Sequence, residues 1–516
     1  MTAQHSALFT PVRVIGFRHR IKKTAKGEAR PTQVAIRTVS TGAVISLALD
    51  TETDEVDFVL GRYPTKWRKA EEGEDLSAFA KHHVVPVKKG STDMKVPAAY
   101  EGLSTGDAVV TTLGGSGGYF ALASARRGQK IGAAVYRITP GGLKDARGED
   151  GDKDKDAELL VTLFMDGVQK FYDVRERDGA GILVTELLRS RTEAMQARIA
   201  CGQRLRGQAI GSAFRQAGEN VDVFKGIGNI EAEFDRLKAT DAVYMALETE
   251  ELRRFRELTK SVEAMDVYAD IFDSVDGAGP ATAARIIAAV GDVRRFQVKV
   301  DQKEIDRLRS EIHACEELAG VDTWDPNDLG LVSYEGDASA ETAKAAWQEA
   351  VERKDRKRQI QIVRSNLRRA GAESEAETLD ESLRLREQIG ALHRKAEQRG
   401  ENKFLAFCGV GLRMEDGKGV FMRRKAGARA NWQPEARQGF YLLGDQWNKR
   451  PDSVWGKKLR EVKAKLRATH PEPVKNEKKT LYTDGHIQRM AVWRTITLFA
   501  KWLYREWVKL EVRNSK

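Results

Sequence analysis

Short apolar runs of the kind that form β-strands end near residue 138, and long charged segments with helical spacing follow them. This change constrains the fold most, because side chains return to the same face every two residues in a strand and every 3.6 residues in a helix. The strand-like runs are VRVIGF, TQVAIRTV, AVISLAL, VDFVLG, DAVVTT and IGAAVYRI. The segment GGYFALASARRG lies between the last two and predicts a helix that joins neighbouring parallel strands. We therefore expect an α/β domain over residues 1–175.

The segments after this domain predict long helices. Residues 181–216 and 229–272 carry apolar residues at intervals of three and four among dense charges, which is typical of helices packed in pairs. A second charged stretch, residues 298–402, contains a connector rich in Pro, Gly and Asp, and it indicates an inserted helical arm. Such apolar stripes are usually packing seams, so we expect no chemistry from them.

The positive charge of the chain is concentrated at one end. The 516 residues exceed one ordinary domain, and the chain has a net charge of +11. Residues 413–516 hold 25 Lys and Arg against 11 Asp and Glu, and six of the nine tryptophans lie there as well. This composition favours a folded domain with cationic faces that binds nucleic acid. The alternative is a helical domain with a solvated basic exterior.

Three further features concern the compartment. Cys201, Cys315 and Cys408 are far apart and match neither a disulfide framework nor a thiolate metal site, which favours a reducing interior. The N-terminus lacks the pattern of a signal peptide, and no apolar run approaches the roughly 18 residues of a membrane span. We expect a soluble, cytoplasmic and nucleoid-associated protein without a membrane partner.

A glycine turn between the helical arms is the strongest candidate for nucleic-acid binding. In FDSVDGAGPATAARIIAAVGDVRRF, Gly277 and Gly279 bracket a tight turn, and Pro280 fits the first position of a helix. Such a turn exposes backbone N–H groups that hold a DNA phosphate, although it also suits a simple helix cap. Arg294 and Arg295 would attract the DNA backbone at longer range through their positive charges. The candidate nucleic-acid-binding residues are Gly277, Gly279, Thr282, Arg285, Arg423, Arg424, Lys425 and Arg429.

The order of these segments resembles that of the insertion-sequence-110 family of transposases. The stretch from DAVVTT to ITPGG resembles the strand that carries the family's second acidic residue, together with the helix and the strand that follow it. DKDKDAELL is similar to the family's paired-aspartate segment. VDGAGPATAARIIAAVGDVRRF followed by KFLAFCGVG resembles its transposase domain, and GHIQRMAVWRTITLFAKWLYREW its closing helix. The resemblance covers roughly residues 100–300 and 403–507.

This resemblance implies a fold of class α/β plus α. It consists of an N-terminal RuvC/RNase H-like mixed sheet, long coiled helical arms, and a mostly helical C-terminal domain that contains a helix-hairpin-helix. The implied function is that of a DNA transposase or site-specific recombinase that uses Mg²⁺, acts as a dimer or tetramer, and in some relatives is guided by a structured RNA. The implied segments are a RuvC-like domain at 1–175, a helical linker at 176–271, the helix-hairpin-helix at 272–297, an insertion at 298–402 and the basic remainder at 403–516.

The resemblance also implies which carboxylates would bind metal. Asp156 corresponds to the family's last aspartate, and Asp152 replaces the other member of the pair because Lys153 stands at its position. Asp154 is the less favoured choice, and a solvated acidic start of a helix is the simpler interpretation. Asp50 corresponds to the first-strand acid, with Asp57 as the second choice. The predicted catalytic and metal-binding residues are therefore Asp50, Asp152 and Asp156, while the family's glutamate falls near Gly114.

The family's serine nucleophile has no counterpart in this chain. Residues 403–452 contain no Ser or Thr, and Asp416 occupies the approximate position. Cys408, in a strand-like run, and Tyr441 are the remaining nucleophile candidates, and both are more typical of packing residues. A second hypothesis follows from these departures: the protein is a domesticated homologue that binds DNA or RNA without cutting it.

Two other patterns predict no site. GGSGG at residues 114–118 lacks the rest of a phosphate-binding loop and favours a strand-to-helix turn. His82, His83, His470 and His486 show no metal-ligand spacing and are expected on the surface or in the core.

Overall fold

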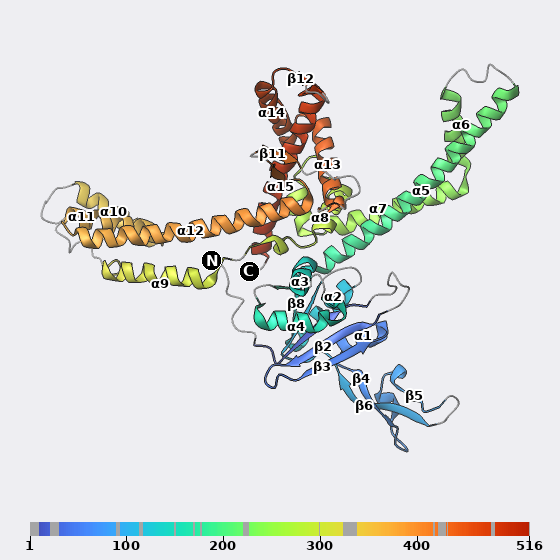
Figure 1. Cartoon of the computed structure of the whole chain (residues 1–516), viewed down its shortest axis with the longest axis horizontal. Helices are drawn as coiled ribbons and strands as arrows, with labels where there is room; N and C mark the ends of the chain where they lie inside the picture. The colour runs from blue at the N-terminus through green and yellow to red at the C-terminus, as the bar shows by residue number, and fades with distance from the viewer. Residues whose placement is uncertain are drawn as a thin grey trace. The chain divides into compact units, whose positions relative to one another are not determined.

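The computed structural model divides into two compact units, one made of Met1–Arg295 with Phe407–Lys516 and one of Phe296–Ala406 (Figure 1). The domain boundaries expected from the sequence stay predictions. The structure describes residues 10–20, 30–88, 93–112, 117–148, 151–168, 171–175, 178–219, 227–298, 300–323, 338–415, 418–421, 430, 432–475 and 480–514.

A six-stranded mixed sheet forms the N-terminal part of the first unit. Its order is β3-β2-β1-β7-β8-β9, and the central strand β1 pairs antiparallel with β2 and parallel with β7. Strands β7 and β8 are also parallel, as expected for strands joined by a helix. The predicted N-terminal mixed sheet is therefore confirmed. The strands are β1 (Arg13–Arg18), β2 (Thr32–Thr38), β3 (Val44–Leu49), β7 (Asp107–Thr112), β8 (Ala134–Ile138) and β9 (Tyr172–Asp173).

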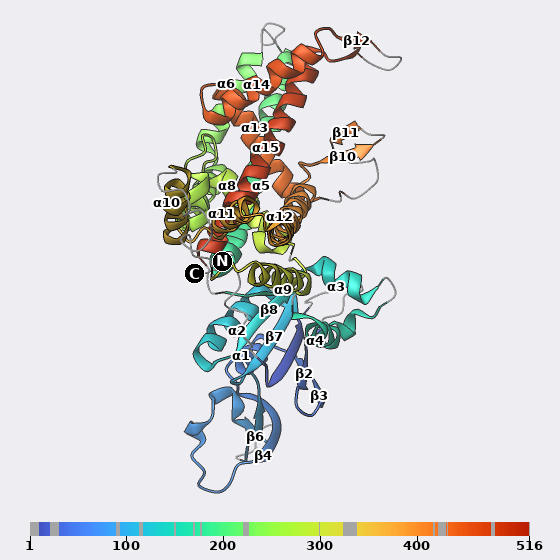
Figure 2. The same ribbon diagram turned by 90° about the vertical axis from the view of Figure 1, so that its left-hand side faces the viewer.

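Helices cover both faces of this sheet. Alternate residues of β1 point to opposite sides, so that Ile15 and Phe17 join a core with α1 and α2 while Val14 joins a core with α4. Figure 2 shows α2 and α4 on opposite sides of the strands. The covering helices are α1 (Glu52–Val59), α2 (Gly117–Ile131), α3 (Pro140–Arg147) and α4 (Asp156–Asp166).

A glycine in the central strand allows α4 to approach closely. A Cβ atom on Gly16 would lie 2.1 Å from the carbonyl oxygen of Ala157, so only glycine permits this distance between strand and helix. The close approach places the N-terminus of α4, which begins with Asp156, beside β1.

The prediction of a strand in VDFVLG is wrong, because most of this segment lies in helix α1. Thr51 caps the helix by accepting a hydrogen bond from the Asp54 N–H, and the Asp54 side chain accepts one from the Thr51 N–H. This capping box favours a helix start over the β-propensity of Val and Phe.

A smaller sheet lies between α1 and β7 in the sequence. Its order is β4-β6-β5, and all its pairs are antiparallel. Two short 3₁₀ helices, η1 (Leu76–Ala78) and η2 (Lys81–His83), precede β5. The strands are β4 (Tyr63–Lys69), β5 (Val85–Pro86) and β6 (Met94–Glu101).

Long helices follow the sheet, as predicted. Helices α5 (Asp178–Glu219) and α7 (Ala242–Glu263) pack side by side, and Cys201 of α5 shares a buried cluster with Tyr244 of α7 (Figure 1). The expected continuous helix over 229–272 is divided, because Asp241 caps a new helix start by accepting from the Tyr244 N–H. The separate parts are α6 (Ile227–Thr240), α7 and the π-helix η6 (Tyr268–Phe272).

The C-terminal helices enclose an aromatic core. Trp447, Phe440 and Phe499 are fully buried, with ring centroids 5.1 Å apart between Trp447 and Phe499. The strand-like interpretation of the run around Cys408 is wrong, because this run ends helix α12. The elements are α8 (Pro280–Val290), η7 (Val293–Phe296), β10 (Leu412–Glu415), β11 (Lys418–Phe421), α13 (Pro434–Lys449), α14 (Val454–Thr469), β12 (Val474–Lys475), β13 (Thr480–Leu481) and α15 (Asp484–Arg513).

The second unit is helical where the structure describes it. One buried cluster joins α11 to the start of α12, and another joins α9 to the middle of α12. Among the described helices of the whole chain, none combines the length and apolar composition needed to cross a membrane. The helices of this unit are α9 (Gln302–Leu318), α10 (Ala338–Glu352), α11 (Arg356–Arg369) and α12 (Glu373–Cys408).

Candidate nucleic-acid interface

The glycine turn before α8 adopts a conformation that requires glycine at one position. Gly277 has φ +85°, and a Cβ atom there would lie 2.6 Å from the Cβ of Gln446 in α13. The Trp447 indole donates a hydrogen bond of 3.1 Å to the carbonyl oxygen of Asp276, which holds the turn against α13. Gly277 is therefore explained by backbone geometry and packing alone.

Gly279 differs from Gly277, because the space around it is open. Gly279 is the N-cap residue of α8, and no side chain caps the helix there in the described structure. No atom lies within 4 Å of the position that a Cβ atom on Gly279 would occupy. Pro280 stands at the first helical position, as predicted, and Thr282 lies half-buried in the first turn. The positive end of the helix dipole is therefore open here. Pro280 has no N–H, and the N–H groups of Thr282 and Ala283 donate to the Gly279 carbonyl oxygen, so the N–H of Ala281 is the donor of this turn that would face an anion.

Two arginines lie near this turn. Arg450 is exposed, and its Nη1 lies 3.3 Å from the Cβ position of Gly277. Arg285 of α8 is half-buried, and burial together with the neighbouring Arg191 lowers the pKa of Arg285. The 3.4 Å hydrogen bond of Arg285 goes to the amide oxygen of Gln438, which carries no negative charge. The positive charge of Arg285 is therefore not neutralised by a directly bonded carboxylate in the described part of the chain.

Helix α14 presents a strongly basic outer face. Leu459 and Leu466 are buried, whereas Lys457, Arg460, Lys463 and Lys465 are exposed. Six basic residues stand against the single acid Glu461: Lys457, Lys458, Arg460, Lys463, Lys465 and Arg467. Within the residues that the structure describes, the exposed Lys457, Lys463 and Lys465 form no ion pair.

The tryptophans of this region serve mainly the fold. Arg437 lies between the rings of Trp432 and Trp493, with its guanidinium carbon 4.5 and 4.7 Å from the two ring centroids. Burial lowers the pKa of Arg437. Because these faces already contact a cation, they are not open to stack on nucleic-acid bases.

The predicted metal-binding aspartates contact other partners. Asp156 is buried, and both of its carboxylate oxygens accept hydrogen bonds from Nη1 of Arg147, at 2.8 and 2.7 Å. Asp152 caps η3 (Lys153–Lys155), and Asp50 is exposed directly after the edge strand β3. No grouping of potential metal ligands found among the described residues includes these three aspartates. In this arrangement the three aspartates do not fit a Mg²⁺ site, and their role as ligands stays a prediction.

The end of the central strand is cationic. Arg18, His19 and Arg20 follow one another there, and Arg18 forms an ion pair of 2.9 Å with Asp154. Glu55 accepts hydrogen bonds from Arg20 and Thr32. Burial raises the pKa of Glu55, but hydrogen bonds from His19, Thr32 and Arg20 outweigh burial, so the pKa is lowered. A site for two divalent ions needs several unpaired carboxylates, and this cluster supplies cations instead.

Arg294 has a structural role that the sequence interpretation missed. It is buried and lies 2.7 Å from Asp292, 2.9 Å from Asp173 and 3.2 Å from Asp178. Burial lowers the pKa of Arg294, but the three carboxylates raise it more. The guanidinium thus joins η7, which follows α8, to β9 of the sheet and to the start of α5, and it is not available to nucleic acid. Arg295 lies over the ring of Phe407.

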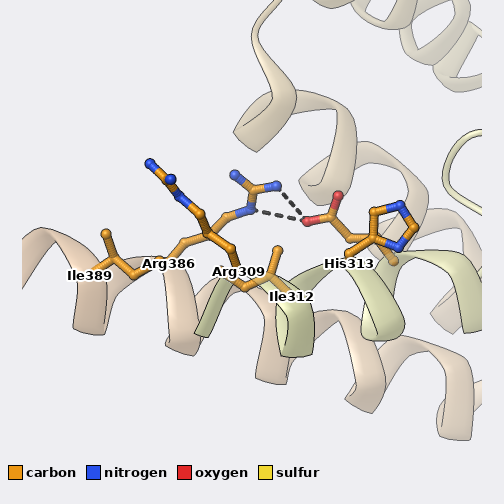
Figure 3. Close-up of a pocket in the computed structure, with 6 residues that line it drawn as sticks. Arg309, Ile312, His313, Arg386 and Ile389 are labelled. Atoms are coloured by element: carbon orange, nitrogen blue, oxygen red, sulfur yellow. Dashed lines mark hydrogen bonds and ion pairs between the residues drawn. The ribbon is translucent and has the colours of Figure 1, made fainter. Parts of the chain in front are cut away.

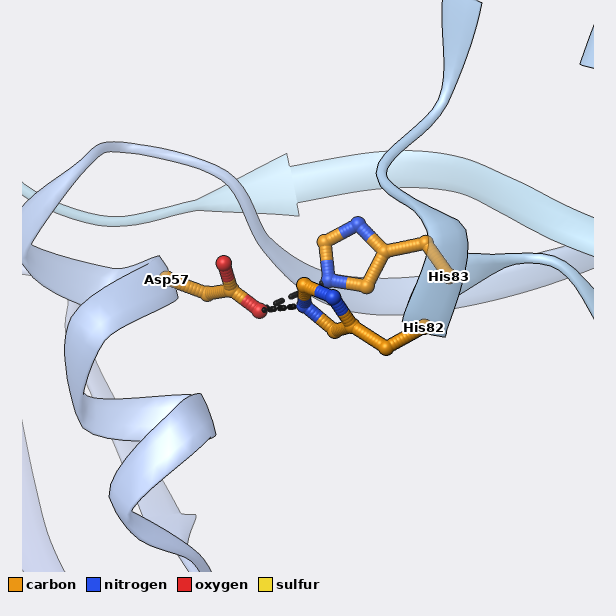
Figure 4. A group of neighbouring side chains, drawn as sticks. All are labelled: Asp57, His82 and His83. Carbon is orange, nitrogen blue, oxygen red and sulfur yellow. Dashed lines mark hydrogen bonds and ion pairs between the residues drawn. The ribbon is translucent and has the colours of Figure 1, made fainter. Parts of the chain in front are cut away.

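A compact cluster forms where no site was expected. His82 Nε2 and His83 Nε2 lie 2.6 and 2.8 Å from the same oxygen of Asp57, and Arg62 donates to the other oxygen at 2.8 Å (Figure 4). Burial raises the pKa of Asp57, but the hydrogen bonds from His82, Arg62 and His83 outweigh it and lower the pKa. The adjacent histidines were visible in the sequence, but Asp57 lies 25 residues away and no spacing rule joins them.

The two nucleophile candidates differ in exposure, since Cys408 is buried and Tyr441 is exposed, and several other predicted residues lie outside the described part. Cys408 is fully buried, which raises the pKa of its thiol, and the ring of Tyr441 packs 6.1 Å from Trp493. Gly117 and Gly118 begin α2, as a strand-to-helix turn predicts. Outside the described residues lie Gly114, Asp416, Arg423, Arg424, Lys425 and Arg429.

A shallow pocket in the second unit is structural as well. It is lined by Arg309, Ile312, His313, Glu316, Arg386 and Ile389. Arg386 donates two hydrogen bonds to Glu316, whose carboxylate also accepts from Ser382 and Arg356 (Figure 3). Because Glu316 is buried and fully engaged, this network connects α9 to α11 and α12 and leaves no reactive group.

Comparison of the chain with protein-family models and with curated proteins finds no match.

Proposed function

We propose that the protein binds nucleic acid, with duplex DNA as the main ligand. The observation that carries the proposal is the outer face of α14, where exposed lysines lack ion-pair partners in the described structure. Such cations release counterions from a phosphate backbone when they bind it, and this release is the main source of sequence-independent affinity. The open N-terminus of α8 adds a site for one phosphate.

In this proposal the protein acts as an architectural or regulatory DNA- or RNA-binding protein. It resembles the insertion-sequence-110 transposases in segment order but does not cut DNA. The ion pairs of Asp156 with Arg147 and of Asp154 with Arg18 support this version, because they occupy the carboxylates that a nuclease would need.

A recombinase of the insertion-sequence-110 type is the second candidate. It is supported by the order of the mixed sheet and by the position of Asp156 at the start of α4 beside β1. This candidate requires that Arg147 release the Asp156 carboxylate. It also requires magnesium, a nucleophile, an oligomer and, by analogy with some members of that family, a guide RNA. Each of these remains a proposal.

The binding proposal is tested with a variant that separates binding from folding. Gly279→Asp places a carboxylate at the N-cap of α8, where the backbone (φ −57°) and the open space accept it. Asp is a favoured N-cap, so the folded state is kept or stabilised, while its charge repels a phosphate. Fluorescence anisotropy with a labelled DNA duplex should show binding at least about 5-fold weaker than for the unchanged protein.

The matched control is Gly141→Asp, which adds the same charge in the first turn of α3, at another position without neighbours. It should leave DNA affinity unchanged. Equal affinity for all three proteins would remove α8 from the interface, and absence of salt-dependent binding to duplex DNA or folded RNA would refute the proposed function. Incubation with magnesium and the DNA that flanks the gene tests the second candidate, which predicts a recombinant junction that Asp156→Ala abolishes.

A further inference from the structure

Asp57, His82 and His83 bring three ligand atoms of metal-binding type to one point. Asp57 belongs to α1, and both histidines belong to η2 in the segment that carries the small sheet. The carboxylate oxygen and the two imidazole nitrogens all lie within 4.8 Å of one another. Among the residues that the structure describes, these three are the one group of His, Cys, Asp or Glu side chains whose ligand atoms lie this close together.

The surroundings hold these side chains in place. Asp57 and His83 are almost completely buried, and His83 packs against the rings of Trp67 and Tyr100. Arg62 binds the outer oxygen of Asp57, so that the inner oxygen faces the imidazoles. Carboxylate ligands of metal ions are commonly hydrogen-bonded in this way by a second residue.

One member of the cluster is exposed to solvent. The side chain of His82 is 44% exposed, and Figure 4 shows its imidazole beside the His83 ring and the Asp57 carboxylate. A water molecule therefore has access to an ion held by the three side chains. The cluster thus offers two nitrogens, one oxygen and one solvent position, which is the coordination of a tetrahedral ion.

We propose that Asp57, His82 and His83 bind a divalent transition-metal ion, and that this ion is zinc. Imidazole nitrogens with one carboxylate suit Zn²⁺, whereas Mg²⁺ prefers a full set of oxygen ligands. Ligand atoms on a tetrahedral zinc ion lie roughly 3.3 Å apart, given bonds of about 2.0–2.2 Å. The present contacts of 2.6 and 2.8 Å are hydrogen bonds, so binding requires a shift of roughly half an ångström and loss of the bridging protons.

Bound zinc would connect two parts of the first unit. The ion joins α1, which covers the main sheet, to η2, which precedes β5 of the small sheet. Because the ligands come from positions 57, 82 and 83, the ion also closes the chain between them. We infer that zinc stabilises the small sheet against local unfolding, a role independent of nucleic-acid binding.

The test measures zinc binding by the full-length protein after removal of metal with a chelator. Titration against a chromogenic zinc chelator should show one tightly bound Zn²⁺ per chain, and Co²⁺ should give the visible absorption of a tetrahedral site. His82→Ala removes an exposed ligand and should weaken zinc binding at least about 100-fold, more than the loss of an outer partner does. His393→Ala, an exposed histidine of α12, is the matched control and should leave zinc binding unchanged.

Thermal unfolding of the metal-free proteins shows whether the His82→Ala variant still folds. A loss of zinc binding can then be distinguished from a loss of structure. Zinc should raise the unfolding temperature of the unchanged protein and of the control variant, but not that of His82→Ala. Absence of a bound equivalent, or equal zinc affinity with and without His82, would overturn the site. Tighter binding of Fe²⁺ than of Zn²⁺ would overturn the assignment to zinc, because two histidines and a carboxylate also form iron sites.

Discussion

The sheet domain and the C-terminal helices of the first unit use their arginines and lysines in opposite ways. In the sheet domain, Arg147 is bonded to Asp156 at 2.7 Å, and Arg18 is bonded to Asp154 at 2.9 Å. On α14, by contrast, the exposed Lys457 and Lys463 have no acid partner in the described structure, and Lys465 interacts with Glu461 without forming an ion pair. Cations of the first kind stabilise structure, and cations of the second kind remain available to a polyanion.

The physical difference lies in hydration and counterions. A paired, partly buried arginine has already exchanged water for a carboxylate, so it gains little from a phosphate. An unpaired surface lysine keeps its water, and it displaces condensed counterions when it meets DNA. The comparison therefore predicts which substitutions affect stability and which affect binding.

The largest expected effect concerns a paired cation. Arg294→Ala removes one cation that Asp173, Asp178 and Asp292 share. Arg137 still pairs with Asp178 and Asp292, and Arg175 still pairs with Asp173, so the expected loss is at the lower end for a broken buried pair, about 3 kcal/mol. Denaturant unfolding should show this loss, whereas Arg253→Ala, which breaks exposed pairs on α7, should show no measurable change. Equal stability of the two variants would break the comparison.

The next effect concerns the unpaired cations. Replacing Lys457, Lys463 and Lys465 by Ala should reduce the slope of log affinity against log salt by about 3 and weaken DNA binding about 100-fold at low salt. Anisotropy titrations at several salt concentrations measure both quantities. The matched control removes three exposed but paired arginines, Arg236, Arg253 and Arg307, and should leave the slope nearly unchanged. A similar loss in both triple variants would mean that pairing does not decide which cations bind DNA.

A smaller effect is expected from pH. Hydrogen bonds and ion pairs lower the pKa values of Glu55, Asp57 and Asp292 below the usual range, against the opposing effect of burial. A carboxylate whose pKa is lower in the folded state stabilises the fold above its unfolded pKa of about 4, and this contribution is lost as the pH falls through the folded value. The free energy of unfolding should therefore be flat from pH 7 to 5 and fall below about pH 4. The lysine-to-alanine variant of α14 should follow nearly the same curve, since these lysines form no ion pair in the described structure and Lys465 only adds to the effect of Lys458 on the pKa of the exposed Glu461.

Local patterns predicted much of the architecture. The period of two in VRVIGF matches β1, and Gly277 with Pro280 marks the turn and the start of α8. The VDFVLG segment was misassigned because a capping box decides the helix there, while apolar β-branched residues suggested a strand. The interface residues stay a prediction: Gly279 lies in open space at a helix start, whereas Arg294 forms structural ion pairs.

Sequence alone determined the succession of strands and helices and the concentration of positive charge toward the C-terminus, because period and composition are properties of neighbouring residues. Only the tertiary structure decided which charges are neutralised. Asp57 meets His82 and His83 across 25 and 26 residues, and Asp173 meets Arg294 across 121 residues. Coulomb interactions and hydrogen bonds depend on distance in space, and folding sets that distance independently of separation along the chain.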